Sequence, residues 1–312
     1  MKALIFDIYK GTTGDGPGMR DTVFFKGCPL SCKWCHNPEG IDFKNRVWWE
    51  SRTCIGCGLC GDICKNKAIF LGESGVEISP DLCQLCHSCT ETCPTKSITA
   101  VAQEYTVDEL SAEIIKDKEY FESSGGGVTA SGGEAMMHLE FLYEFFSQMK
   151  KESVSTALDT TGFCDSEKLF KILQKTDILL YDLKVIDPSL HKKWTGVDNN
   201  TILENITLVS EYIKSGNQLR LWIRTPIIPG FTDDAKIISE IADFIKSNLF
   251  DSVERWELCS FNNSCTHKYE KLGKKWELEE SSLISKEIIN QLLSVAEKSG
   301  VPEIITSGII KE

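Results

Sequence analysis

Long apolar runs are missing from this sequence. No stretch approaches the roughly 18 consecutive apolar residues of a membrane-spanning helix, and the segment Met1–Asp7 is too short for a secretion signal. Positive charge is also scarce, because 34 Lys and Arg face 46 Asp and Glu and leave a formal net charge of -12. Such a surface repels nucleic acids and anionic membranes. We therefore expect an acidic cytoplasmic protein with neither as a partner.

Cysteine, in contrast, is abundant. The chain has 14 cysteines, with three in residues 28–35 and eight in residues 54–93. Because cytosolic thiols stay reduced, clustered cysteines there indicate metal ligands rather than disulfides. The scattered Cys164, Cys259 and Cys265 are expected to be unligated.

The chain from Tyr105 onward alternates between helical and strand patterns. Helices are expected at 106–121, 138–151, 166–174, 201–215, 234–248 and 282–298, and strands at 22–26, 127–131, 154–159, 178–184, 219–225 and 254–261. Thr106 with Glu109 three residues later indicates a capping box. This alternation predicts an α/β fold with a parallel sheet. We expect a partial (β/α)6 barrel formed by residues 1–47 and 101–312; a doubly wound open sheet is the alternative.

The first cysteine motif, Cys28-x3-Cys32-x2-Cys35, follows the expected strand at 22–26. Three thiolates on one loop can hold three corners of a four-iron cube and leave the fourth iron open for a substrate. A zinc site with His36 as fourth ligand is the alternative, although this spacing is unusual for zinc.

The second motif consists of two runs with the same spacing. They are Cys54-x2-Cys57-x2-Cys60-x3-Cys64 and Cys83-x2-Cys86-x2-Cys89-x3-Cys93. Two-cluster bacterial ferredoxins have this spacing, and the fourth cysteine of each run ligates the other cluster. One cluster is then expected on Cys54, Cys57, Cys60 and Cys93, and the other on Cys83, Cys86, Cys89 and Cys64. Residues 48–100 thus predict an inserted α+β ferredoxin-like domain, either an electron wire or a structural insert, with zinc knuckles as the alternative.

Segments with polar residues fall at the carboxyl ends of the expected strands, where barrel enzymes place their active sites. The polar residues are Glu134, Asp159, Asp182, Lys184, Arg224 and Asn262, and their segments also contain Gly132, Gly133 and Leu183. Individually they have plain explanations, such as a tight turn at Gly132 or an ion pair between Asp182 and Lys184. Together with the cysteine loop they indicate one active site.

The chain resembles the radical S-adenosylmethionine (SAM) superfamily, whose signature Cys-x3-Cys-x-aromatic-Cys has Trp34 in its aromatic position. Over nearly its whole length it is similar to the activating enzymes of glycyl radical enzymes. The segments that carry this similarity are Asp15–Arg20, Trp34–Glu39, Gly125–Glu134, Asp159–Gly162, Asp182–Lys184, Ile223–Pro226 and Ile228–Gly230.

The resemblance implies three [4Fe-4S] clusters, reductive cleavage of SAM to a 5'-deoxyadenosyl radical, and hydrogen abstraction from a glycine of a partner enzyme. Gly132–Glu134 would meet the methionine amino group of SAM. The remaining contacts would come from Asp159, Asp182, Leu183, Lys184, Arg224, Asn262 and the backbone from Trp34 through Cys35 to His36. A flavodoxin or ferredoxin would donate the electron. Two positions depart from the family pattern: Ala135 replaces a proline, and Asn262, which cannot titrate near neutral pH, replaces a histidine of one branch.

Two other functions stay open from the sequence. One is a radical SAM enzyme that acts on a small molecule or peptide, with its auxiliary clusters as an electron relay. The other is an electron-transfer ferredoxin or a zinc-stabilised interaction protein. Three four-iron clusters predict about twelve irons per chain, which separates the last class from the others.

Overall fold

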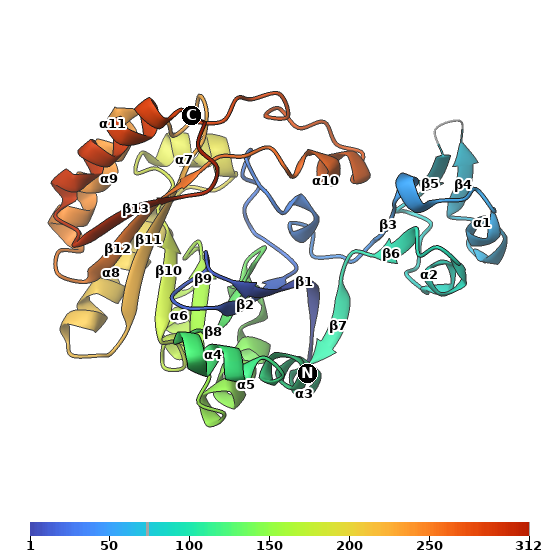
Figure 1. The fold of residues 1–312 in the computed structure, drawn as a ribbon, viewed down its shortest axis with the longest axis horizontal. Helices are drawn as coiled ribbons and strands as arrows, with labels where there is room; N and C mark the ends of the chain where they lie inside the picture. Colours follow the sequence, from blue (N-terminus) through green and yellow to red (C-terminus); the bar gives the residue numbers. More distant parts are fainter. Residues whose placement is uncertain (73–74, 312) are drawn as a thin grey trace.

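A nine-stranded sheet forms the centre of the computed structural model, which describes residues 1–72 and 75–311 (Figure 1). Its strand order is β13-β12-β11-β10-β9-β8-β2-β1-β7. The strands are β1 (Lys2–Thr12), β2 (Arg20–Phe25), β7 (Gln103–Thr106), β8 (Gly127–Gly132), β9 (Ser155–Thr160), β10 (Ile178–Asp182), β11 (Arg220–Ile227), β12 (Val253–Ser260) and β13 (Glu303–Ser307). β1 is antiparallel to both β2 and β7, whereas β2 and β8 to β13 run parallel. The protein is therefore a mixed α/β fold with a mainly parallel sheet.

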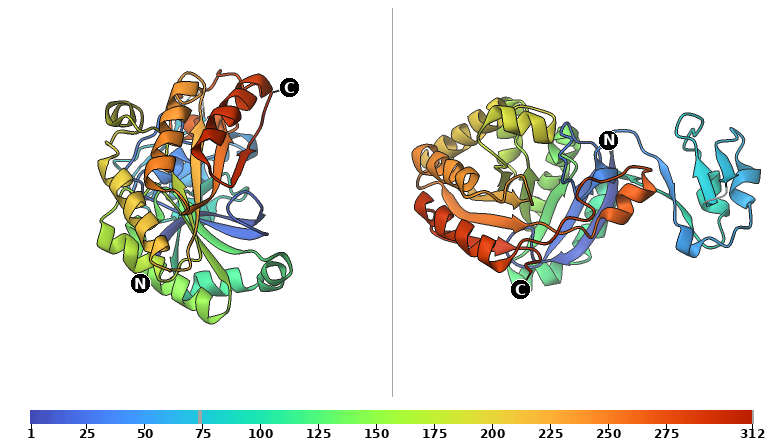
Figure 2. Two further views of the ribbon diagram at one scale, coloured as in Figure 1. Left: turned by 90° about the vertical axis from the view of Figure 1, so that its left-hand side faces the viewer. Right: turned by 90° about the horizontal axis from the view of Figure 1, so that it is seen from above.

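Helices lie outside the sheet and bury an apolar layer against it (Figures 1 and 2). They are α3 (Val107–Ile115), α4 (Lys118–Ser124), α5 (Leu139–Lys151), α6 (Ser166–Leu173), α7 (Pro188–Thr195), α8 (Asn200–Lys214), α9 (Ala235–Asn248) and α11 (Lys286–Ala296). The short helix α10 (Thr266–Lys271) lies instead on the side of β3 (Val47–Trp49) and β6 (Ile98–Ala100) (Figure 1). Among the described residues, no helix is both long and apolar enough to cross a membrane.

The two faces of the parallel strands differ. Leu179, Leu221 and Ile223 belong to the main core under the helices. Their alternate neighbours Leu180 and Trp222 pack with Ala157 and Ile178 in a separate inner cluster. Because side chains alternate along a strand, the next residues on this inner face toward the carboxyl ends are Asp159, Asp182 and Arg224. The sheet thus gathers polar groups at one end of its inner face.

The structure confirms most predicted elements and corrects others. The capping box of Thr106 and Glu109 is present. The prediction of one continuous helix at 106–121 is wrong. The helix is interrupted at Lys116–Asp117, which separates α3 from α4. β1, β7 and β13 were not predicted, and seven parallel strands replace the expected six. The parallel strands follow chain order without the reversal of a doubly wound sheet.

The part of the chain from β3 to β6 extends away from the central sheet (Figures 1 and 2). It contains β3 (Val47–Trp49), α1 (Leu59–Ile63), β4 (Ile69–Gly72), β5 (Gly75–Ile78), α2 (Ser88–Thr92) and β6 (Ile98–Ala100). β3 pairs with β6 and β4 with β5, and these pairs surround a small apolar cluster of their own. We call this segment the insert. The boundaries 48–100 and 1–47 with 101–312 stay a prediction.

Candidate active site

The loop with Cys28, Cys32 and Cys35 leaves the carboxyl end of β2 and is fixed through its backbone. Cys28 N donates to Ile41 O over 2.9 Å, Ser31 N to Thr195 O over 2.7 Å, and Lys33 N to Trp194 O over 3.0 Å. Burial raises the pKa of all three thiols, that of Cys35 to about 12. A buried thiolate needs a positive partner, and metal coordination replaces the thiol proton in this way. Three cysteines on one loop whose backbone is fixed are a donor set that suits a metal cluster.

The other two predicted residues of this loop point their rings into the protein. Trp34 is buried with ring centroids 5.7 Å from Phe231 and 6.3 Å from Trp194. The imidazole of His36 packs edge-on against Phe261 and Trp276, and burial lowers its pKa. Both rings thus pack against other aromatic side chains of the protein.

Gly132 and Gly133 bring the end of β8 against the base of the cysteine loop. Gly133 N donates to Phe25 O and Glu134 N to Gly27 O, each over 2.8 Å. A Cβ at Gly133 would lie 2.5 Å from Gly27 O, and Gly132 has a φ of +112°. Glycine is required here because backbone meets backbone.

The carboxylate of Glu134 is buried and saturated by protein donors. It accepts hydrogen bonds from Thr160 Oγ1 (2.7 Å), Thr161 Oγ1 (2.7 Å), Thr161 N (2.9 Å) and Met136 N (3.2 Å). Burial raises its pKa, and these hydrogen bonds oppose that effect. Glu134 therefore fastens the turn after β9. The ammonium group of a ligand, from which Glu134 was expected to accept a hydrogen bond, would have to compete with these four donors.

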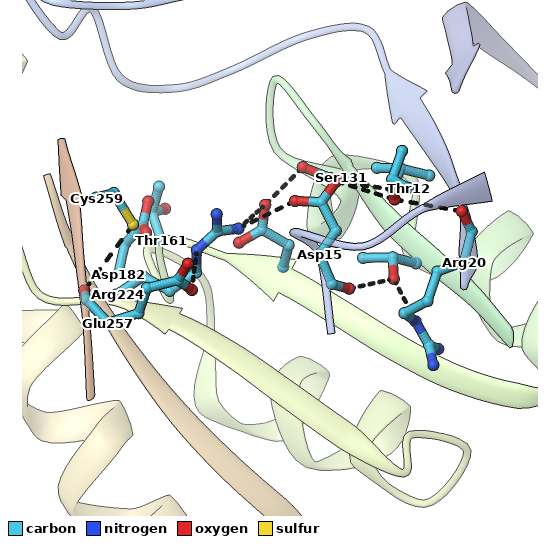
Figure 3. Close-up of polar contacts among 12 residues, drawn as sticks. Thr12, Asp15, Arg20, Ser131, Thr161, Asp182, Arg224, Glu257 and Cys259 are labelled. Carbon is cyan, nitrogen blue, oxygen red and sulfur yellow. Dashed lines mark hydrogen bonds and ion pairs between the residues drawn. The ribbon is translucent and has the colours of Figure 1, made fainter. Parts of the chain in front are cut away.

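Arg224 is the centre of a buried polar network on the inner face (Figure 3). Its Nη1 lies 3.3 Å from Asp15 Oδ1 and 3.5 Å from Asp159 Oδ2, and its Nε lies 3.4 Å from Glu257 Oε2. Ser131 Oγ donates to Asp159 Oδ2 over 2.6 Å. Burial raises the pKa of Asp159 to about 7, although the Arg224 guanidinium opposes this. One cation thus joins carboxylates from three other segments of the chain.

The base of this network is the loop between β1 and β2. Asp15 Oδ2 accepts from Thr22 Oγ1 over 2.9 Å, and Asp15 O accepts from Thr129 Oγ1 over 2.7 Å. Thr129 Oγ1 in turn accepts from Nε of the buried Arg20 over 2.8 Å. The segment Asp15–Arg20 therefore supports Arg224 from within the fold.

Lys184 pairs with Asp182 at the carboxyl end of β10 and lies near the cysteine loop. Burial disfavours its charge, but the carboxylate of Asp182 and the nearby Cys32 outweigh burial and raise the pKa of Lys184. Leu183 N donates to Arg224 O over 2.9 Å and fixes this segment beside β11. The structure thus brings a buried cation close to Cys32.

Asn262 lies in the turn after β12, where its Oδ1 accepts from Ser264 N (3.2 Å) and Ser264 Oγ (2.5 Å). Its side chain is therefore used within its own turn. Three nearby residues that sequence reasoning did not assign to the site anchor the cysteine loop. Tyr269 Oη donates to Cys35 O, Trp276 Nε1 to Lys33 O, and Lys268 Nζ to Asn37 Oδ1. These long-range contacts leave no local pattern in the sequence.

The eight cysteines of the insert line two cavities. The first is bordered by Cys54, Cys57, Cys60 and Cys93. The second is bordered by Cys64, Cys83, Cys86 and Cys89. Each thus has three cysteines of one run and the last of the other. Within residues 1–72 and 75–311, no three His, Cys, Asp or Glu side chains converge as ligands of one metal ion do.

Comparisons with known proteins identify the family. A family model described as a 4Fe-4S single cluster domain matches residues 14–203, more than half of the chain. The trans-4-hydroxy-L-proline dehydratase activating enzyme of Clostridioides difficile is 37% identical over 302 residues, covering 96% of this chain and 97% of the relative. The 4-hydroxyphenylacetate decarboxylase activating enzyme of Clostridioides difficile (strain CD196) is 35% identical over 308 residues, covering 96% and 95%.

A solved structure supports the fold alone. A radical SAM methyltransferase from Sphaerobacter thermophilus has a TM-score of 0.54 and 13% identity, covering 97% of this chain and 77% of its own. The two activating enzymes are above 30% identity over almost their entire length. The chain therefore belongs to the radical SAM activating enzymes of glycyl radical enzymes.

Proposed function

We propose that this chain binds a four-iron cluster on Cys28, Cys32 and Cys35 and uses it to activate one glycyl radical enzyme. The proposal is supported by the position of the three-cysteine loop against the polar strand ends. Lys184 lies near Cys32, and Glu134 N donates a hydrogen bond to Gly27 O. The chemistry supplied by a bound cluster and SAM is reductive cleavage of a carbon–sulfur bond, which yields the radical that takes hydrogen from glycine.

The protein residues bind and orient SAM beside that cluster. Lys184 and Arg224 are the buried cations that favour a carboxylate, and Asp159 and Asp182 balance their charge. Because the Glu134 carboxylate is already saturated, the backbone of Gly132–Glu134 is the better acceptor for the SAM ammonium. Leu183, Asn262 and the Trp34–His36 backbone complete the proposed contact set.

The insert is proposed to be a ferredoxin-like domain with two further four-iron clusters, beside a partial (β/α)6 barrel. The two cavities support this proposal, since each is bordered by the four cysteines expected for one cluster. Ser97 N donates to Cys93 Sγ and Ala68 N to Cys64 Sγ, each over 3.2 Å. Backbone donors to cysteine sulfur are the kind of interaction that tunes cluster potentials.

The partner is proposed to be a glycyl radical enzyme, with a flavodoxin or ferredoxin as electron donor. One relative is named as the activating enzyme of a dehydratase, and another as the activating enzyme of a decarboxylase. A dehydratase of the first kind is the first partner to test, because that relative shares 37% identity.

An anaerobic assay tests the proposed function. The reconstituted protein, reduced and supplied with SAM, should form 5'-deoxyadenosine, and adding a candidate partner should produce a glycyl radical signal in electron paramagnetic resonance (EPR). Formation of 5'-deoxyadenosine with a small molecule or peptide, but with no partner radical for any candidate, would favour the alternative radical SAM function. No cleavage of SAM by protein with intact clusters would refute both.

Iron analysis tests the cluster count. The proposal expects about twelve irons per chain, and Cys35→Ala should abolish SAM cleavage while the spectra of the insert clusters persist. Zinc in place of iron, only about eight irons in the wild type, or retained cleavage in Cys35→Ala would contradict it.

A further inference from the structure

The short helix α10 is attached to the segment that follows Cys35. Tyr269 Oη donates to Cys35 O over 2.8 Å, and Lys268 Nζ lies 2.6 Å from Oε1 of the buried Glu39. Lys268 Nζ also donates to Asn37 Oδ1 over 2.9 Å. These contacts fix α10 to the cysteine loop from one side.

The other side of α10 is attached to the insert. Lys271 Nζ lies 2.7 Å from Glu50 Oε2 and 4.8 Å from the ring centroid of Trp48. Lys271 and Glu50 both border a groove between α10 and the insert. The ion pair is partly shielded, since the two side chains are 20% and 34% exposed. It therefore bridges a gap that solvent would otherwise fill.

Glu50 is the chain neighbour of Trp49, which lines the first cavity together with Cys54 and Ser97. Its carboxylate accepts from Arg52 N and caps the turn Ser51–Thr53, which leads directly into Cys54. Glu50 N donates to Ser97 O over 2.8 Å, and Ser97 N donates to Cys93 Sγ over 3.2 Å. Glu50, the partner of Lys271, is thus hydrogen-bonded to the backbone segments that carry Cys54 and Cys93, two of the four cysteines of this cavity.

The second cavity lies beside a different part of the molecule. Its residues Cys83, Leu85 and His87 border an open groove that is also lined by Phe43 and Gln103. That side of the insert therefore faces the main sheet across open space.

We propose that Lys271 is a positioning residue: through Glu50 it sets the first cavity against the catalytic loop. Cys54, Cys57, Cys60 and Cys93 would then hold the cluster that supplies the electron directly to a cluster on Cys28, Cys32 and Cys35. This inference rests on the proposed function. The transfer would oxidise the donor and reduce the acceptor by one electron, with no bond broken and no proton moved. A low-potential one-electron carrier protein would reduce the donor again.

The test is the magnetic coupling between reduced clusters in the holoenzyme, read from the relaxation of the catalytic cluster signal in EPR without SAM. Cys57→Ala should remove most of the relaxation enhancement, and Cys86→Ala should leave most of it. The reverse result would overturn the assignment of the first cavity as the proximal one. Because SAM turnover is not measured, failure of this inference is distinct from failure of the proposed function.

Variants of Lys271 test the positioning role. Lys271→Ala should weaken the coupling at least twofold and speed amide hydrogen exchange at residues 50–54 at least threefold, whereas Lys271→Arg should preserve both. Lys275→Ala, at an exposed lysine of the same segment, is the control and should match the wild type. If Lys271→Ala loses its clusters, the charge exchange Glu50→Lys with Lys271→Glu should restore the coupling. Unchanged coupling in Lys271→Ala, or none in a folded charge-exchange variant, would overturn the proposal.

Discussion

Tyr269 Oη donates a 2.8 Å hydrogen bond to the carbonyl oxygen of Cys35, which lies 234 residues earlier in the chain. The ring of Tyr269 stacks on Trp276 with centroids 5.0 Å apart and planes 9° apart. The indole of Trp276 in turn donates to Lys33 O over 2.8 Å. The conformation of the cysteine loop therefore depends on a pair of aromatic residues near the end of the chain.

Tyr269→Phe tests that dependence. The substitution keeps the stacked ring but leaves the carbonyl of Cys35 without this donor, which costs about 1–2 kcal/mol of unfolding free energy. Anaerobic denaturant titration of the clustered protein should show that loss. The EPR line shape of the catalytic cluster should change, and the spectra of the insert clusters should not. A variant with wild-type stability and line shape would contradict this role.

Gly133→Ala should destabilise the protein by about 2–3 kcal/mol or more, as overpacking does. The new Cβ would lie 2.5 Å from Gly27 O and 2.7 Å from Gly40 O, and backbone atoms cannot move aside as flexible side chains do. The matched control is Gly14→Ala, because a Cβ there meets nothing within 4 Å. We expect the control to stay within about 0.5 kcal/mol of the wild type. Equal unfolding midpoints for the two variants would refute the steric argument.

Arg224→Ala should cost about 3–5 kcal/mol, because it leaves Asp15, Asp159 and Glu257 without their shared buried cation. Arg220→Ala in the same strand is the control. Its ion pair with Glu254 is 47% and 40% exposed, so we expect a loss of at most about 1 kcal/mol. Comparable losses for the two arginines would show that the inner network adds no stability.

The carboxyl group of Asp159 should make stability depend on pH. Burial raises its folded-state pKa to about 7 from the ordinary value of 3.8, despite the opposing effect of Arg224, while Asp182 and Asp15 add to the rise. Between these values the folded protein binds more protons than the unfolded chain, so its stability falls as pH rises toward 7 and levels off above it.

Asp159→Asn removes that titration. From pH 5.5 to pH 7, the unfolding free energy of the wild type should therefore fall relative to that of Asp159→Asn. Parallel pH profiles for the two proteins would contradict the raised pKa of Asp159.

Local patterns in the sequence were sufficient for much of the fold. Apolar periodicity predicted α5, α6, α8 and α9, because one face of each helix is buried, and short β-rich runs predicted most of the parallel strands. The pattern failed for the stretch 106–121, where helical residues continue through a break at Lys116–Asp117. β1, β7 and β13 were missed as well, and β1 and β7 are the antiparallel strands at one edge of the sheet.

The sequence by itself determined the cysteine spacing, the polar strand ends and the family that they indicate. Only the tertiary structure decided that Glu134 is saturated by the threonines after β9, that Asp15 meets Arg224, and that α10 joins the cysteine loop to the insert. The physical reason is how far apart the contacting residues lie along the chain. Spacing along the chain constrains ligands that share one loop, whereas contacts between distant segments arise only when the packed sheet and helices bring those segments together.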